Sequence, residues 1–310
     1  LQTPGQRPGG PKAISYQLVR ACVKTTKECV RSPSQKTGVS ARVPLMNNCI
    51  DHDVTTWDEF KNVWAGVHNF AMGGECVPFS FSFPGIEQIV DELRNDEMVK
   101  VRPGVPDTKL RTEDMSESFR KMSLSQALNS NFGVAHFKLS QFDRPGKFLH
   151  GFNEQVFTPW RDALTSLGFT WERCYPICFV SGKGCSTNYH MDFSQVLAWQ
   201  VYGTKRFCGL RNPDQWADRE ARLHYDPAKC ERPGTLTESD AECFLMEPGA
   251  ALWNTLLTPH WVEAGNSVAM SINISHGGLR LNGKLCPHEE ELVAHRALDP
   301  DFAKPVQGSY

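Results

Sequence analysis

The chain has 310 residues, of which 40% are hydrophobic, and this length is enough to bury one large core with or without a smaller accessory domain. Its formal net charge is only −2, so the molecule has no overall electrostatic bias toward acidic membranes, and nucleic acid is not an expected partner. No segment approaches the roughly 20 consecutive apolar residues that a membrane-spanning helix needs.

Residues 1–42 differ from the rest of the chain. They include several Pro and Gly residues and eight Lys or Arg against a single acid, Glu28. This composition predicts a flexible basic tail. A targeting peptide and an arm that binds an acidic partner are the alternatives.

Residues 43–168 are predicted to form an α+β accessory region that packs on the domain after it. Thr56-x-x-Glu59 is a capping box, and it opens a helix with apolar residues at helical spacing as far as Phe70. Further helices are expected after Gly85, over 123–129 and over 158–167, and a strand over 133–139. In the helix over 158–167, Thr158 is the expected N-cap and Pro159 the first helical residue.

After residue 168 the chain changes to short strand-like segments that Gly, Pro and Asn separate. They span residues 169–180, 195–202, 205–210, 243–246, 250–254, 260–264 and 267–275. Many short strands at regular spacing predict a sandwich or a barrel over residues 169–280. Residues 281–310 are predicted to be a polar tail with a short helix at 287–296. That helix is suited to a homodimer contact, and an isolated surface helix is the alternative.

The run His190-Met191-Asp192 is the strongest functional signal. Residues i and i+2 of a strand point to the same face, so His190 and Asp192 can bind one cation together. His260, at the start of a strand-like segment, is the best third ligand. Two histidines and one carboxylate leave three coordination positions open, as in non-haem iron(II) oxygenases. A catalytic zinc with three protein ligands is the competing chemistry.

Two other histidines are weaker candidates for the third ligand. His276 precedes Gly277-Gly278 and is expected in a loop, and His224 lies in a charged segment that is expected to be exposed.

Turn residues place a lysine at the same site. Gly203-Thr204 fits a two-residue hairpin turn, which would set Tyr202 opposite Lys205. If one strand runs unbroken from His190 to Tyr202, Lys205 then shares the face of the metal ligands. A buried lysine needs an anionic partner, and a dicarboxylate cosubstrate would supply one.

A second hairpin turn is expected at Gly265-Asn266. It would set His260 opposite Ser271, with Asn273 as the diagonal neighbour on the same face. The small and polar residues of this face suit the lining of a cavity.

Residues from about 169 to 280 resemble the JmjC and cupin-like oxygenases that depend on iron(II) and 2-oxoglutarate. Within that family, they are most similar to the branch that contains the asparaginyl hydroxylase acting on hypoxia-inducible factor. The motifs that carry the resemblance are Thr187-x-x-His190-x-Asp192, Gly203-x-Lys205-Arg206, Glu247-Pro248-Gly249, Pro259-His260-Trp261 and Ser271-Ile272-Asn273. The resemblance implies a mainly β fold with flanking helices, in which a double-stranded β-helix (a jelly-roll barrel) follows the α+β region.

The resemblance also implies the site and its cofactors. His190, Asp192 and His260 would bind Fe(II), Lys205 would pair with the far carboxylate of 2-oxoglutarate, and O2 would be the oxidant. Thr187, which matches the family's threonine three residues before the first histidine, would assist in binding the cosubstrate, and Asn273, which matches the asparagine of the last barrel strand, would lie near it.

The expected reaction is hydroxylation of a C–H bond in a peptide or protein side chain. Hydroxylation of a small metabolite and N-demethylation are alternatives with the same site. A non-catalytic cupin that acts as a binding module is the alternative from another class. Residues 142–152 are expected to form a solvated loop, with the rim of a substrate entrance as the alternative.

The eleven cysteines include no Cys-x-x-Cys pair, which argues against a structural zinc site. Their odd number and their places inside strand-like runs predict reduced structural thiols in an intracellular, cytoplasmic protein. Because the sequence starts at Leu1, a processed N-terminal targeting segment is the alternative.

Overall fold

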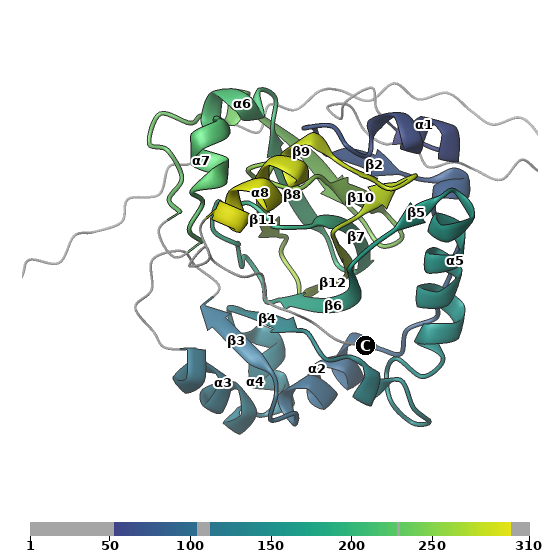
Figure 1. Ribbon diagram of the computed structural model, residues 1–310. Helices are drawn as coiled ribbons and strands as arrows, with labels where there is room; N and C mark the ends of the chain where they lie inside the picture. The colour runs from purple at the N-terminus through teal and green to yellow at the C-terminus, as the bar shows by residue number, and fades with distance from the viewer. Residues whose placement is uncertain (1–52, 104–111, 228–229, 299–310) are drawn as a thin grey trace, which may run out of the picture. The chain divides into compact units, whose positions relative to one another are not determined.

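Figure 1 shows the computed structural model, which describes residues 53–103, 112–227 and 230–298. The predicted tail over 1–42 and the last residues, 299–310, lie outside the described residues. Among the described residues, no helix combines the length and apolar character that crossing a bilayer requires.

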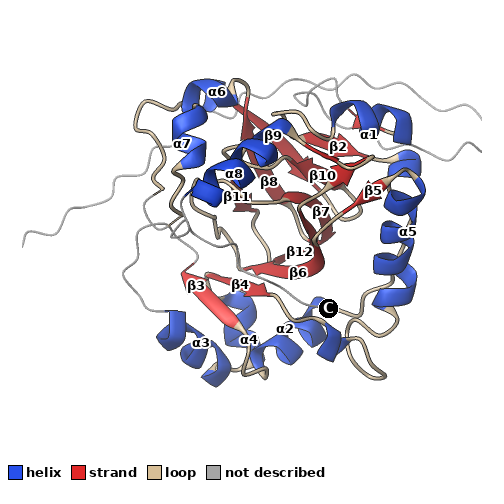
Figure 2. Ribbon diagram, viewed as in Figure 1, coloured by secondary structure: helices blue, strands red, loops and turns tan. Residues whose placement is uncertain are grey.

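Most strands belong to one eight-stranded sheet, which is antiparallel except where β1 runs beside β2. Figure 2 shows the strands in red. In sheet order, the strands are β1 (Asp53–Val54), β2 (Phe70–Met72), β10 (Ala251–Asn254), β7 (Gln195–Tyr202), β12 (Ala269–Gly277), β6 (Arg173–Ser181), β4 (Phe132–His136) and β3 (Lys100–Pro103). The strands that precede residue 169 therefore extend the same sheet as those that follow it. The division into an accessory region and a catalytic barrel stays a prediction.

Two smaller sheets complete the β-structure. One has the order β11 (Trp261–Ala264), β8 (Lys205–Leu210) and β9 (Ala241–Met246), and the other has the order β14 (Lys284–Leu285), β13 (Arg280–Leu281) and β5 (Phe169–Thr170). The mainly β character with flanking helices is confirmed. The closed double-stranded β-helix stays a prediction.

Both predicted hairpins are wrong. β7 pairs with β10 and β12, whereas β8 pairs with β9 and β11, so Gly203 takes the chain from one sheet to another instead of reversing it. Gly203 has a φ of 58°, and a Cβ there would lie 2.4 Å from the carbonyl oxygen of Val268. Residues 265–268 make a second corner, because β11 pairs with β8 and β12 pairs with β6 and β7. A turn signal in the sequence does not distinguish a corner from a hairpin.

The helices follow their predicted starts more closely than their ends. They are α1 (Trp57–Val63), α2 (Ile86–Arg94), α3 (Thr112–Lys121), α4 (Leu124–Asn129), α5 (Thr158–Ser166), α6 (Pro213–Trp216), α7 (Arg219–Leu223) and α8 (Pro287–Leu298). The capping box of Thr56 and Glu59 is confirmed, but α1 ends at Val63 and Phe70 lies in β2. Thr158 does not cap α5, because a π-helical turn over Asn153–Phe157 leads directly into it.

The alternation along β12 positions the site. Met270, Ile272 and Ile274 are buried in the main hydrophobic core, together with Trp160 of α5 and Trp253 of β10. Successive side chains of a strand point to opposite faces, so Ser271 and Asn273 lie on the other face. That face carries the polar residues discussed below.

The segment over 142–152 is only partly a solvated loop. Arg144 and His150 are exposed, as expected, but Phe142 and Phe148 are buried in the core. The carboxylate of Asp143 accepts hydrogen bonds from the backbone N–H groups of residues 151 and 153.

One pair of cysteines contradicts the prediction of reduced thiols. Cys208 of β8 and Cys243 of β9 are cross-strand partners with Cα atoms 4.0 Å apart, and a disulfide joins them. The pairing of these strands, 35 residues apart in sequence, could not be foreseen. The other described cysteines are free: Cys76, Cys174, Cys178, Cys185, Cys230 and Cys286. The cellular compartment stays a prediction.

Candidate metal centre

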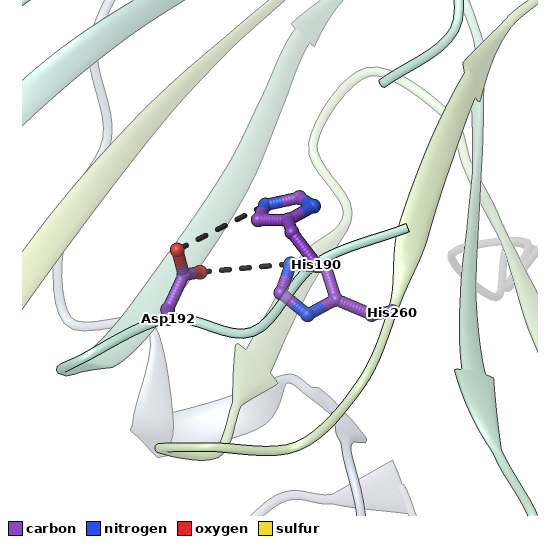
Figure 3. Close-up of side chains that lie close together, drawn as sticks. All are labelled: His190, Asp192 and His260. Atoms are coloured by element: carbon purple, nitrogen blue, oxygen red, sulfur yellow. Dashed lines mark ion pairs between the residues drawn. The ribbon is translucent and has the colours of Figure 1, made fainter. Parts of the chain in front are cut away.

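The three predicted ligands come together. His190 and His260 form an isolated antiparallel bridge, in which each backbone N–H donates to the other residue's carbonyl oxygen at 2.9 Å. Asp192 Oδ1 lies 3.9 Å from His190 Nε2, and Asp192 Oδ2 lies 3.5 Å from His260 Nε2 (Figure 3). In the described part of the chain, this is the one cluster of three His, Cys, Asp or Glu residues with ligand atoms all within 4.8 Å.

The strand that was expected to run unbroken from His190 to Tyr202 is interrupted. Residues 191–194 belong to no strand and β7 begins at Gln195, so His190 and Asp192 lie on a segment before the strand. The backbone N–H of Leu257 donates to the carbonyl oxygen of Asp192 at 2.9 Å. This contact ties the ligand segment to the loop that leads to His260.

Both histidines are oriented to present Nε2 as a ligand atom. His190 Nδ1 lies 2.7 Å from the carbonyl oxygen of Asn188, and His260 Nδ1 lies 2.9 Å from that of Thr258. A carbonyl oxygen only accepts hydrogen bonds, so each Nδ1 carries the hydrogen and each Nε2 keeps its lone pair. Burial lowers the pKa of His260 to about 4, so this imidazole is neutral near pH 7.

Two residues that the sequence did not indicate contact the predicted ligands. The ring of Phe207 stacks on the imidazole of His260, with 4.9 Å between centroids and 10° between planes. Asn254 Nδ2 donates to Asp192 Oδ2 at 2.8 Å. The available signals were a polar residue that ends the apolar strand β10 and an aromatic residue two positions after Lys205.

One side of the centre is open. The side chain of His260 is 3% exposed, whereas those of His190 and Asp192 are 33% and 34% exposed. A molecule from solvent can therefore approach the ligands from the side of His190 and Asp192.

Lys205 lies inside the protein, as predicted, although the hairpin used to place it does not exist. Its Nζ donates to Ser271 Oγ at 3.1 Å and to the carbonyl oxygen of Phe179 at 3.3 Å. Burial lowers its pKa to about 8, and the nearby thiols of Cys178 and Cys185 act in the opposite direction. Within the described residues, Nζ forms no ion pair with a carboxylate, so the buried ammonium has only neutral partners.

The two other predicted cosubstrate residues differ in their surroundings. Asn273 shares its face of β12 with Ser271, and its buried Oδ1 has no hydrogen-bond partner among the described residues. Thr187 is exposed, and its hydroxyl accepts a hydrogen bond from the backbone N–H of Val262 at 2.8 Å. Thr187 thus fastens the segment before His190 to β11.

The alternative histidines are not part of the centre. His276 lies in β12, not in a loop as predicted, and its Nε2 accepts a hydrogen bond from Trp160 Nε1 at 2.8 Å. His224 is exposed and lies 3.5 Å from Glu220.

The donor set fits a divalent metal. Two imidazole Nε2 atoms and a carboxylate, close together and partly buried, are ligands that iron(II) and zinc share. The buried ammonium of Lys205 has no carboxylate partner in the described part of the chain, which fits a carboxylate-bearing cosubstrate.

No protein-family model matches the chain, and no curated protein matches it in sequence. Solved structures of the ribosomal oxygenase YcfD from Escherichia coli match part of its backbone. One has a TM-score of 0.46 with 15% identity, covering 84% of this chain and 63% of that one. Another has a TM-score of 0.44 with 17% identity, covering 84% and 65%.

A third structure of the same E. coli protein, in complex with cobalt and 2-oxoglutarate, has a TM-score of 0.45 with 15% identity and covers 84% and 63%. The chain thus spans less than two thirds of the length of these proteins. The function of this chain is therefore inferred from its own residues.

Proposed function

We propose that the chain is an iron(II)- and 2-oxoglutarate-dependent dioxygenase with a double-stranded β-helix fold. One observation carries the proposal. His190, Asp192 and His260 lie close together, while Lys205, a buried lysine at the start of β8, has no carboxylate partner among the residues that the structure describes. A zinc hydrolase would need the three ligands but would have no use for that lysine.

Each residue has a proposed role. Iron(II) held by His190, Asp192 and His260 would keep three positions for the cosubstrate and O2, and it supplies the oxidising chemistry when bound. Lys205 would bind the far carboxylate of 2-oxoglutarate, with Ser271 holding the ammonium in place. Thr187 and Asn273 are proposed to line the cosubstrate site.

The proposed substrate is a peptide or protein side chain. His190 and Asp192 are each about one-third exposed on the open side of the centre, which suits a segment that approaches from the surface of another protein. A small metabolite would be expected to need a more enclosed site, because small-molecule sites bury most of their ligand.

The decisive experiment supplies the protein with iron(II), 2-oxoglutarate and O2 and measures succinate release. Asp192→Ala is expected to abolish both iron binding and succinate release, whereas Lys284→Met, an exposed lysine of β14, should change neither. Mass spectrometry of candidate peptides then distinguishes the gain of one oxygen from the loss of one methylene. Metal binding without any succinate, with or without peptide, would contradict the proposal and favour the binding module.

A further inference from the structure

Asn254 is a buried polar residue beside the proposed metal ligands. It ends β10 and pairs in register with Val196 of β7, so the sheet fixes its backbone. Its side chain is almost completely buried, at 1% exposure. Its Nδ2 donates to Asp192 Oδ2 at 2.8 Å and lies 3.5 Å from His260 Nε2.

The direction of this hydrogen bond distinguishes the two oxygens of Asp192. Oδ2 receives the amide hydrogen of Asn254 and lies 3.5 Å from His260 Nε2, while Oδ1 lies 3.9 Å from His190 Nε2. If the amide were turned around, two acceptor oxygens would face each other, so the N–H must point at the carboxylate. A carboxylate with one oxygen held this way is disposed to bind a cation through the other.

We propose that Asn254 is a positioning residue that makes Asp192 a single-oxygen ligand and so preserves an open coordination position for the cosubstrate. This inference rests on the proposed function. A carboxylate that binds through both oxygens occupies two positions, and only two would then remain beside the histidines. Binding 2-oxoglutarate through two atoms would leave no position for O2.

The rest of the Asn254 side chain argues against a purely structural role. Its Oδ1 is buried and has no hydrogen-bond partner among the described residues, and such an oxygen costs free energy of folding. The residues before it in β10 are the apolar Ala251, Leu252 and Trp253. An apolar residue of similar shape would remove this cost, so the amide is explained better by its contact with Asp192.

The test compares Asn254→Leu and Asn254→Ala with Thr255→Val, a matched control. Thr255 is the next residue and is fully buried, and its hydroxyl contacts Thr258 and Asn69 but none of the ligands. Thermal unfolding of the metal-free proteins establishes folding. Calorimetry measures the Kd for Co(II) and then the Kd for 2-oxoglutarate on the Co(II)-saturated protein.

Both Asn254 variants are expected to fold and to bind Co(II) about 10- to 100-fold more weakly, the usual effect of losing a residue that orients a ligand. Their 2-oxoglutarate affinity should fall even when Co(II) is saturating, and Thr255→Val should keep both affinities. Wild-type affinities in Asn254→Leu, or failure of both variants to fold, would overturn the inference. If the wild-type protein itself binds no Co(II), it is the proposed function that fails.

Discussion

The ammonium nitrogen of Lys205, on β8, lies 3.1 Å from the hydroxyl oxygen of Ser271, on β12. This hydrogen bond connects the sheet of β11, β8 and β9 to the eight-stranded sheet. Its other acceptor is the carbonyl oxygen of Phe179 on β6. Both acceptors are neutral, and the ammonium is buried. Burying an ammonium without an opposite charge costs free energy, and a bound carboxylate would offset that cost.

The first prediction concerns the binding of 2-oxoglutarate. Lys205→Met should weaken it by about 30-fold or more, because truncating one partner of a buried charge pair costs at least about 2 kcal/mol. Co(II) affinity should not change, because Lys205 is not a ligand. Calorimetry on the Co(II)-loaded protein measures both, with Lys284→Met as the exposed-lysine control. Equal 2-oxoglutarate affinities in the two variants would show that Lys205 does not bind the cosubstrate.

The second prediction follows from the pKa of Lys205, which burial lowers from 10.5 to about 8. Between these values the unfolded chain holds a proton that the folded protein has lost, so the Lys205 contribution to stability rises with pH over this range. Urea unfolding of the ligand-free protein should show this rise as a difference from Lys205→Met. The affinity for 2-oxoglutarate should fall above about pH 8, where the ammonium is lost. A pH-independent difference between the two proteins would contradict the burial of the charge.

The sequence was sufficient to predict that His190, Asp192 and His260 lie together, but not the path of the chain between them. His190 and Asp192 were placed by their spacing and His260 by its position at a strand start, and these depend on local geometry alone. Lys205 was placed inward through a hairpin that is a corner between sheets. Its inward direction was nevertheless right, because a strand that passes into another sheet still turns one side toward the interior.

Contacts between distant strands could not be predicted. Asn254 reaches Asp192 only because β10 pairs with β7, and Cys208 meets Cys243 only because β8 pairs with β9. Such pairings depend on the register of the whole sheet, which turn residues do not specify. His276 was expected in a loop because a glycine follows it. That glycine is instead the last residue of β12, which only the pairing of the strand reveals.

The third prediction concerns the disulfide between Cys208 and Cys243. It closes a segment with a sequence separation of 35, and the chain-entropy relation for such a loop gives a stabilisation of about 4 kcal/mol. A reductant should lower the free energy of unfolding by about 2–4 kcal/mol in the wild-type protein. The double variant Cys208→Ser, Cys243→Ser should not respond to the reductant. An equal response in both proteins would show that the pair is not oxidised in solution.

The fourth prediction separates His260 from His276, the rival third ligand. Burial lowers the pKa of each to about 4, from 6.5. Between pH 6.5 and 4 the unfolded chain takes up protons that the folded protein excludes, so each histidine should cost on the order of 3 kcal/mol of stability as the pH falls. Urea unfolding of the metal-free protein should therefore lose part of its acid sensitivity in either His260→Gln or His276→Gln. The variant amide at 276 can still accept the hydrogen bond from Trp160.

The same two variants should differ in their affinity for Co(II). His260→Gln is expected to lose Co(II) affinity, because it removes an Nε2 that lies 3.5 Å from the Asp192 carboxylate. His276→Gln is expected to keep it, because the Nε2 of His276 is already occupied by Trp160. Acid sensitivity thus reports burial, which both histidines share, and Co(II) affinity reports ligation, which we expect of His260 alone. A loss of Co(II) affinity in His276→Gln that equals the loss in His260→Gln would make His276 a competitor for the third ligand position.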